Sequence, residues 1–548
     1  MSNTDRTTRS LLVRALLIVL LALPAILLLR PLLTGTAKDN VEKKPSKQTS
    51  ASEKKTATPQ SAQATDLARR IDSAIDDSEL SFARWGICVI SMADGTTLYQ
   101  RNADQLFTPA SNMKMYTTGV ALNLLGADYR WRTSVYANAR PDANGRIQGD
   151  LILYGRGAPD LVAQSKDESR GSLAKLAHDL YARGVRSVSG NLIGDESYFR
   201  GDPLGDGWQW TDLQWYFGAE ASALSVNGNE IEVNLVPATK AGDPPTVRSS
   251  DTEDYVTVQN RMAAGDRAGR STIGLHRGLS DNNIEVWGEF APGSKGFGAR
   301  LSVHNPALWA AKLFSDALKT RGVKVEGQTL ARDSRVAPSQ RFNPTQSVEL
   351  ASVSSQPFSE IVKRTNKESI NLYAELILRT LGRERGEMAA LPETKGRERG
   401  DDEVGLAVVR VWLTRAGIAT NRMALHDGSG LSRLDLVTPE SSARLLLSLS
   451  KTNSASVFKE SLPISGRDGT LAGRLKTVVG RVSAKTGYIT YDNSLSGYLT
   501  TSRGELFAFS IMCNDQTGRG DSTRLIDQIV ALLAEFPDLP AEKTQKAQ

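Results

Sequence analysis

Residues 111–126 read SNMKMYTTGVALNLLG and follow the tripeptide Thr108-Pro109-Ala110. Proline in a first turn is a common helix start, so this stretch is predicted to form a helix. The residues expected to form its apolar stripe are Met113, Tyr116, Thr117, Val120 and Leu124. Ser111 and Lys114 are three residues apart, which places their side chains on the same helical face.

Ser111 and Lys114 have the residue types of a nucleophile and its base. A desolvated lysine with a lowered pKa can take the proton of a serine, and a helix N-terminus favours negative charge developing nearby. The S-x-x-K pattern alone is weak evidence, because it also begins at Ser52, Ser172 and Ser456, where a solvated helix face or a loop explains it equally well.

Strand patterns near both ends of the folded region predict one shared sheet. An N-terminal hairpin turns at Ala93-Asp94-Gly95, and three antiparallel strands lie near the C-terminus. The five predicted strands are Trp85–Met92, Thr96–Tyr99, Arg481–Ile489, Leu495–Thr501 and Glu505–Cys513. Helices from Leu67 and around Leu525 would flank this sheet. The Gly- and turn-rich middle of the chain is then an insertion.

Lys485-Thr486-Gly487 occurs once, within the first of the C-terminal strands. A lysine, a hydroxyl and a glycine beside the nucleophile can hold a carboxylate and admit a substrate backbone. The backbone N–H groups of Tyr488 and Ser111 would then form an oxyanion hole. The alternative is a lysine on an exposed strand edge.

Two segments match a middle S-x-N motif. Ser280-Asp281-Asn282 matches the usual form of the motif best. It lies in the turn-rich insertion, however, and is interpreted as a turn. Ser369-Ile370-Asn371 opens a helical pattern and precedes the lysine strand. A catalytic element belongs in the core, so Ser369 and Asn371 are preferred.

The ordered motifs resemble those of the penicillin-recognising serine enzymes. Six strings narrow the resemblance to three-domain, low-molecular-mass class C D-Ala-D-Ala carboxypeptidases/endopeptidases (the penicillin-binding protein 4 type), over about residues 67–537. The strings are SNMKMYTTGVALNLLG, GNLIGDESYF, EASALSVNGNEIEV, RTNKESINLYAELILR, HDGSGLSRLDLVTP and AKTGY…LSGYL.

The resemblance implies an α/β (α+β) transpeptidase-like core, with an antiparallel five-stranded sheet flanked by helices and two inserted β-rich domains. The implied domains are a split catalytic domain, an inserted domain II and an inserted domain III. Their bounds are 67–130 with 345–540, 131–215 with 300–344, and 216–299, respectively.

By this resemblance Ser111 is acylated and Lys114 is its general base. Ser369 relays a proton to the leaving amine, and Asn371 binds the substrate backbone amide. Lys485 helps to place the terminal carboxylate, Thr486 contacts it, and Gly487 and Tyr488 border the substrate. No metal or other cofactor is implied.

Two further substrate contacts follow from the resemblance. Arg433 and Asp195 would read the zwitterionic end of a diaminopimelate-type side chain, the alternative being structural roles, such as Asp195 and Asp427 stabilising turns. The chain also departs from the family pattern at two positions. Ile370 replaces the usual Asp or Asn, and Tyr488 replaces a Thr or Ser, which makes the rim of the substrate pocket bulkier.

The N-terminus predicts export. Residues 1–37 form a signal peptide or an uncleaved membrane anchor, with Arg6 and Arg9 before an apolar run, and residues 38–66 form a polar, disordered tether. The enzyme is therefore expected in the periplasm or another extracytoplasmic space. Its predicted partners are peptidoglycan stem peptides and covalently bound β-lactams, with membrane contact only through the N-terminal segment.

Composition bounds the remaining possibilities. A net charge of +6, scattered along 548 residues, gives little support for nucleic-acid binding. The four histidines show no metal-ligand spacing. Cys88 and Cys513 are interpreted as buried free thiols, with a disulfide as the alternative.

Two rival functions share these features. A β-lactamase would carry the same motifs, but no deacylating Glu is evident and the large insertion suits a cell-wall enzyme. A cell-wall scaffold would have no use for all the intact motif residues. The sequence leaves the balance between carboxypeptidase and endopeptidase action open.

Overall fold

The computed structural model describes residues 59–538 except 168, 239–242, 252–253, 266–270, 291–294 and 393–396. The predicted signal or anchor (1–37) lies outside the described residues, as does the predicted tether up to residue 58. That tether was expected to end at residue 66, but helix α2 (Pro59–Asp76) begins earlier, so the end of the tether prediction is wrong. Within the described residues, no helix combines the length and the apolar character needed to cross a membrane.

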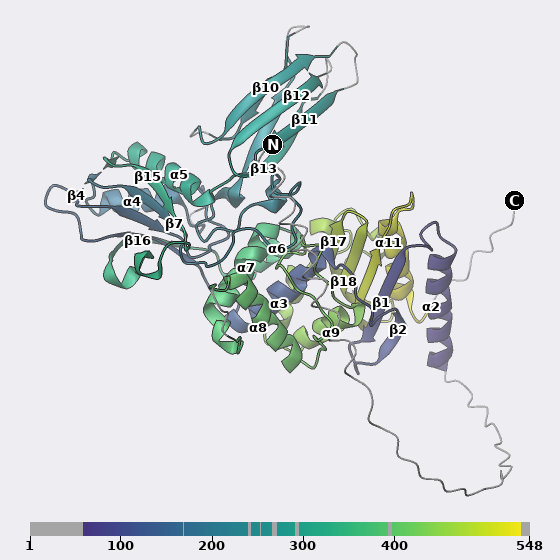
Figure 1. Ribbon diagram of the computed structural model, residues 1–548. Coiled ribbons are helices and arrows are strands. Elements are labelled where there is room, and N and C mark those ends of the chain that lie inside the picture. Colours follow the sequence, from purple (N-terminus) through teal and green to yellow (C-terminus); the bar gives the residue numbers. More distant parts are fainter. Residues whose placement is uncertain are drawn as a thin grey trace, which may run out of the picture. The chain divides into compact units, whose positions relative to one another are not determined.

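A five-stranded antiparallel sheet joins the two ends of the described chain. Its strand order is β17 (Val482–Ile489), β18 (Asp492–Thr500), β19 (Leu506–Asn514), β1 (Arg84–Ser91) and β2 (Thr97–Arg101). Strand β1 pairs along its whole length with β19, from Arg84 opposite Asn514 to Ser91 opposite Phe507. Figure 1 shows the purple strands β1 and β2 in one sheet with β17 and β18 from the other end of the sequence. The predicted sheet is confirmed.

Alternate residues of the sheet enter different cores. Ile87 and Val89 pack with helices α2 and α11 (Ser522–Glu535) on one face. Cys88 lies on the opposite face with Ala443 of α9 (Pro439–Leu449), whereas Cys513 belongs to the α2/α11 face. The two cysteines are therefore separated by the sheet, and both are buried free thiols, as preferred from the sequence. Burial raises the pKa of each thiol to about 12.

Helix α3 (Met113–Leu125) carries the first motif and is buried on every side. All residues from Met113 to Leu122 are buried, so burial includes Met113, Tyr116, Thr117 and Val120 of the predicted stripe and extends beyond it. The helix contacts α6 (Phe358–Lys367), α7 (Asn371–Arg385), α8 (Asp401–Arg415) and α10 (Ala455–Ser461). Its hydroxyls are satisfied internally, for example by the bond from Thr117 Oγ1 to Gly428 O (2.7 Å).

The strands of a second five-stranded sheet come mostly from the predicted domain II. Its order is β15 (Thr329–Arg332), β7 (Leu192–Asp195), β5 (Leu151–Tyr154), β3 (Arg132–Ala137) and β16 (Val348–Ser354). Strand β16 lies beyond residue 344, so this predicted boundary comes too early. Helices α4 (Leu173–Ala182) and α5 (Pro306–Thr320) accompany the sheet, although only β-rich structure was expected here. A small sheet, β14-β6-β4, joins Lys324–Val325, Ser187–Val188 and Arg146–Ile147.

The remaining strands form two three-stranded sheets. One has the order β13 (Phe297–Ser302), β8 (Glu230–Val236), β9 (Thr246–Ser249). The other has the order β10 (Thr257–Ala264), β12 (Asn283–Phe290), β11 (Thr272–Arg277).

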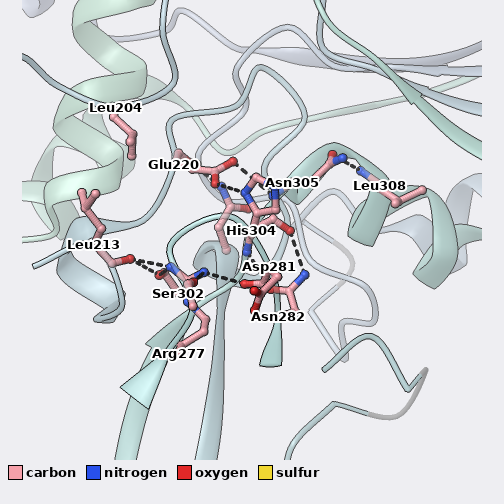
Figure 2. Close-up of polar contacts among 12 residues, drawn as sticks. Leu204, Leu213, Glu220, Arg277, Asp281, Asn282, Ser302, His304, Asn305 and Leu308 are labelled. Carbon is pink, nitrogen blue, oxygen red and sulfur yellow. Dashed lines mark hydrogen bonds and ion pairs between the residues drawn. The ribbon is translucent and has the colours of Figure 1, made fainter. Parts of the chain in front are cut away.

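Figure 2 shows the polar contacts of Asp281 and Asn282, which belong to the second S-x-N segment, Ser280-Asp281-Asn282. The buried Arg277 guanidinium donates to Asp281 O (2.9 Å), Leu213 O (2.7 Å) and Ser302 Oγ (3.0 Å). Asn282 accepts from the His304 backbone N–H and donates to the His304 carbonyl. This segment is the turn before β12 and ties the inserted sheets together, in agreement with its interpretation as a turn.

Candidate active site

Ser111 lies where a short 3-10 turn (Ala110–Asn112) leads into α3. Ala110 has a left-handed φ of 48°, so the chain bends sharply just before the serine. Ser111 lines a cavity of about 670 Å³. Four other predicted site residues line the same cavity, namely Ser369, Asn371, Arg433 and Tyr488.

The Lys114 amine is in contact with three groups. Its Nζ donates to Ser111 Oγ (2.9 Å), to Asn371 Oδ1 (2.6 Å) and to the Ser429 carbonyl (2.7 Å). The side chain is wholly buried. Burial lowers the pKa of Lys114 to about 7, against the charges of Asp427 and Glu375, which raise it. The amine can therefore exist in its neutral, proton-accepting form near neutral pH.

Lys485 holds the second serine. From strand β17 its Nζ donates to Ser369 Oγ (2.9 Å) and to the Thr486 carbonyl (2.9 Å). Burial and the charge of Lys114 lower the pKa of Lys485 well below its usual range. The lysine is fully buried, which excludes the alternative of an exposed strand edge. Thr486 Oγ1 shares a hydrogen bond with Thr470 Oγ1 (2.7 Å), and Thr470 also lines the cavity.

Asn371 joins the first motif to the inserted region. While its Oδ1 accepts from Lys114, its Nδ2 donates to the carbonyl of Phe217 (2.9 Å). Ser369, two residues earlier, has a left-handed φ of 59° at the junction of α6 and α7. The three motifs thus meet around Ser111 from separate parts of the chain.

Gly487 and Gly430 allow close backbone approaches around Ser111. A Cβ at Gly487 would lie 3.1 Å from the Ser111 backbone nitrogen and 2.6 Å from Pro109 O. Gly430 has φ 78°, and a Cβ there would lie 1.8 Å from the Ala110 carbonyl oxygen. Neither position has room for a side chain.

Arg433 and Tyr488 form part of the outer cavity wall. Arg433 Nη1 donates to Thr490 O (3.1 Å) and lies 3.8 Å from Asp492 Oδ2, while its Nε has no hydrogen-bond partner. The Tyr488 side chain is 77% exposed, as expected for a bulky rim residue.

The structure does not bring Asp195 to this cavity. Asp195 is wholly buried at the end of β7, where it accepts from the backbone N–H and hydroxyl of Ser197 and lies 3.4 Å from Arg332. Its position fits the structural alternative, in which Asp195 stabilises the chain after β7. Asp427 also has a structural position, since it accepts backbone N–H groups of Ser429, Gly430 and Ser432.

Several cavity and support residues escaped the sequence analysis. Thr470 and Phe217 lie near the motifs only after folding, and nothing in their local sequence marks them. Glu375 lies four residues after Asn371 on the same helix, but one glutamate in a helical pattern does not mark a site residue. Asp427, which opens the DGSG string, was named from the sequence as a turn-stabilising residue.

The family model and two relatives that match this chain are all described as D-Ala-D-Ala carboxypeptidases. The model of the D-Ala-D-Ala carboxypeptidase 3 (S13) family matches residues 67–536. The D-alanyl-D-alanine carboxypeptidase of Actinomadura sp. (strain R39) is 34% identical over 495 residues, which cover 87% of this chain and 86% of the relative. D-alanyl-D-alanine carboxypeptidase DacB of Haemophilus influenzae is 28% identical over 413 residues, covering 74% and 80%, respectively.

The crystal structure of penicillin binding protein 4 (dacB) from Haemophilus influenzae is similar throughout. It superposes with a TM-score of 0.71 at 25% sequence identity, and the match covers 86% of this chain and 99% of that one.

Proposed function

Because the chain belongs to the D-Ala-D-Ala carboxypeptidase 3 (S13) family, and is thus a serine-type D-Ala-D-Ala carboxypeptidase, we propose that Ser111 is its acylated nucleophile. The observation that carries this assignment is the hydrogen bond from Lys114 Nζ to Ser111 Oγ (2.9 Å) beside a cavity that also holds Ser369 and Asn371. A nucleophile in contact with its base and open to a cavity meets the geometric requirement for acyl transfer.

In the proposed acylation, neutral Lys114 takes the hydroxyl proton while Ser111 Oγ attacks the carbonyl carbon of the penultimate D-alanine. The backbone N–H groups of Ser111 and Tyr488 stabilise the oxyanion. Ser369, held by Lys485, relays a proton to the amine of the departing D-alanine. Water then attacks the ester, which restores Ser111 and releases the shortened peptide.

Substrate is held by groups around this centre. Asn371 Nδ2 has two N–H donors, and one of them donates to the Phe217 carbonyl. The other binds the substrate backbone. Thr486, with Thr470 beside it, receives the terminal carboxylate. Lys485 is fully buried and acts through Ser369 and the Thr486 carbonyl rather than by touching the carboxylate.

The natural substrates proposed are peptidoglycan stem peptides outside the cytoplasmic membrane. A structure of penicillin binding protein 4 from Haemophilus influenzae contains a β-lactam, and we propose that this chain forms a covalent adduct with β-lactams at Ser111. Cross-linked peptides also present a bond after D-alanine, so endopeptidase action belongs to the same proposal.

Ser111→Ala should abolish both fluorescent penicillin labelling and release of D-alanine from purified muropeptides. Without the oxygen nucleophile no acyl ester can form. Mass spectrometry of the digests measures the result: loss of one alanine indicates carboxypeptidase action, and conversion of dimers to monomers indicates endopeptidase action. Ser172→Ala, in the S-x-x-K string that starts α4, is the matched control and should label normally. Labelling of Ser111→Ala would contradict the assignment.

Arg433→Ala should selectively lower kcat/KM for substrates with an anionic side chain. A guanidinium–carboxylate contact contributes about 1.5–3 kcal/mol, so kcat/KM should fall about 10- to 100-fold for a peptide with a free side-chain carboxylate. The same peptide with that carboxylate amidated should lose little. Equal losses for both peptides would show that Arg433 acts only through packing against Thr490 and the cavity wall.

A further inference from the structure

Helix α7 presents a second polar side chain to the catalytic region, one turn after Asn371. Glu375 is wholly buried, and its position four residues along the helix places it on the same face as Asn371. Nothing in the reaction proposed above uses this carboxylate. A buried carboxylate with no structural or chemical task would be costly, so its contacts deserve an explanation.

Glu375 binds two groups at once. Its Oε1 accepts the backbone N–H of Gly428 (2.9 Å), and its Oε2 accepts from Arg379 Nη1 (2.8 Å). The Arg379 side chain is itself buried, 3.7 Å from Asp402, and donates to the Asp202 carbonyl. The carboxylate is thus fixed between its own helix and the loop that begins at Asp427.

That loop supplies one of the three contacts of the catalytic lysine. The Ser429 carbonyl accepts from Lys114 Nζ (2.7 Å). On the other side of Gly428, Asp427 accepts from the Ser429 and Gly430 N–H groups and from Trp208 Nε1. Glu375 and Asp427 therefore hold the peptide units immediately before and after Gly428, and the direction of the Ser429 carbonyl depends on both.

Charge adds a second link between Glu375 and Lys114. The pKa of Lys114 is lowered by burial and raised by the charges of Asp427 and Glu375. The pKa of Glu375 is itself raised to about 7, by burial and by Asp427, against the charge of Arg379. The charged and titratable groups around the lysine and this carboxylate are Lys485, Asp427, Asp435, Arg379, Asp401 and Asp402.

We propose that Glu375 is a positioning residue for the reaction, which fixes the Ser429 carbonyl against the Lys114 amine and, in its ionised form, places a negative charge near that amine. This role rests on the proposed function, because it acts on the base that activates Ser111. It also explains why an acidic residue is buried one turn below a residue that contacts the lysine.

The test is Glu375→Gln, which keeps the acceptor for Gly428 N–H but removes the charge. Lys114 acts in its neutral form, so activity falls as pH drops through its pKa. Removing a nearby negative charge disfavours the ammonium form and lowers that pKa. The acidic limb of kcat/KM against pH should move to lower pH by less than about one unit, because the pKa of Glu375 is itself raised to about 7 and the carboxylate loses part of its charge across the same pH range.

The control is Glu387→Gln, the same chemical change at an exposed residue just beyond α7. The acidic limb of its kcat/KM profile should lie at the same pH as in the wild type. If Glu375→Gln does not fold because Arg379 is left without its partner, the double variant Glu375→Gln/Arg379→Met removes both charges and should show a smaller displacement in the same direction, because loss of the more distant arginine charge offsets part of the effect. Circular dichroism confirms folding in each case.

The outcomes separate the two proposals. A wild-type protein that releases no D-alanine at any pH would overturn the proposed function. An active wild type and a folded variant with an unmoved acidic limb would overturn the role of Glu375 alone. A folded variant whose rate falls equally at every pH would reduce Glu375 to a purely structural residue, which also contradicts the proposal.

Discussion

Lys114→Met should stop acylation of Ser111 while leaving the protein folded. Methionine has a similar length but accepts no proton, and a general base contributes about 10²- to 10⁴-fold to a rate. We expect fluorescent penicillin labelling and peptide hydrolysis to fall by at least about 10³-fold, within that range. Methionine leaves the Asn371 Oδ1 and Ser429 carbonyl acceptors without this donor, at about 1–3 kcal/mol each, so circular dichroism is used to check that the variant is folded before labelling is compared.

Lys175→Met is the matched control for this experiment. Lys175 stands in another S-x-x-K string but on the exposed side of α4, where it pairs with Asp179 at 2.8 Å. Its loss should change neither labelling nor hydrolysis. Rapid labelling of Lys114→Met would mean that another group deprotonates Ser111, and Lys485 would then be the next lysine to replace.

Gly430→Ala should damage the site through contact as well as through backbone strain. The new Cβ would lie 1.8 Å from Ala110 O, and Ala110 directly precedes Ser111. The turn that presents the nucleophile must shift to relieve this overlap. A displacement of about 1 Å in a catalytic group can cost about 100-fold in rate, and we expect a loss of that size in kcat/KM.

Gly417→Ala separates the effect of backbone strain from the effect of the contact with Ala110. Gly417 has φ 76°, close to the 78° of Gly430, but an added Cβ there meets nothing within 4 Å. It should lose about 1–2 kcal/mol of unfolding free energy, the cost of a left-handed backbone for a non-glycine residue, and keep full activity. Chemical denaturation and steady-state kinetics on both variants measure the difference. Equal activity in the two variants would remove the contact with Ala110 as a cause.

The catalytic sheet and the motifs were predictable because their signals are local. Alternating apolar residues define strands such as β1 and β19, and the order of the three motifs requires no knowledge of packing. The choice of Ser369 over Ser280 also followed from position in the chain. In the structure, Ser369 contacts Lys485 and lines the cavity, whereas Asn282 fixes the backbone of His304.

The errors arose where distant residues decide the outcome. The apolar stripe of helix α3 was predicted, but its burial on every side was not, because that depends on distant partners such as the Gly428 carbonyl, which accepts from the Thr117 hydroxyl. Residues 348–354 were placed in the catalytic domain, but as strand β16 they pair with β3, which lies far away in the sequence. Asp195 was expected at the substrate, but Arg332 from a parallel neighbouring strand lies beside it inside the protein.

The pairing of β1 with β19 has a consequence for the order in which the molecule is made. Arg84 and Asn514 are 430 residues apart, yet they are neighbours in the sheet. During translation Ser111 is synthesised long before Lys485 and strand β19. The growing chain therefore carries this serine before the residues that surround it in the folded protein exist. Such long-range pairing also slows folding. The full set of contacts around Ser111 can therefore form only after strands β17 to β19 have been synthesised.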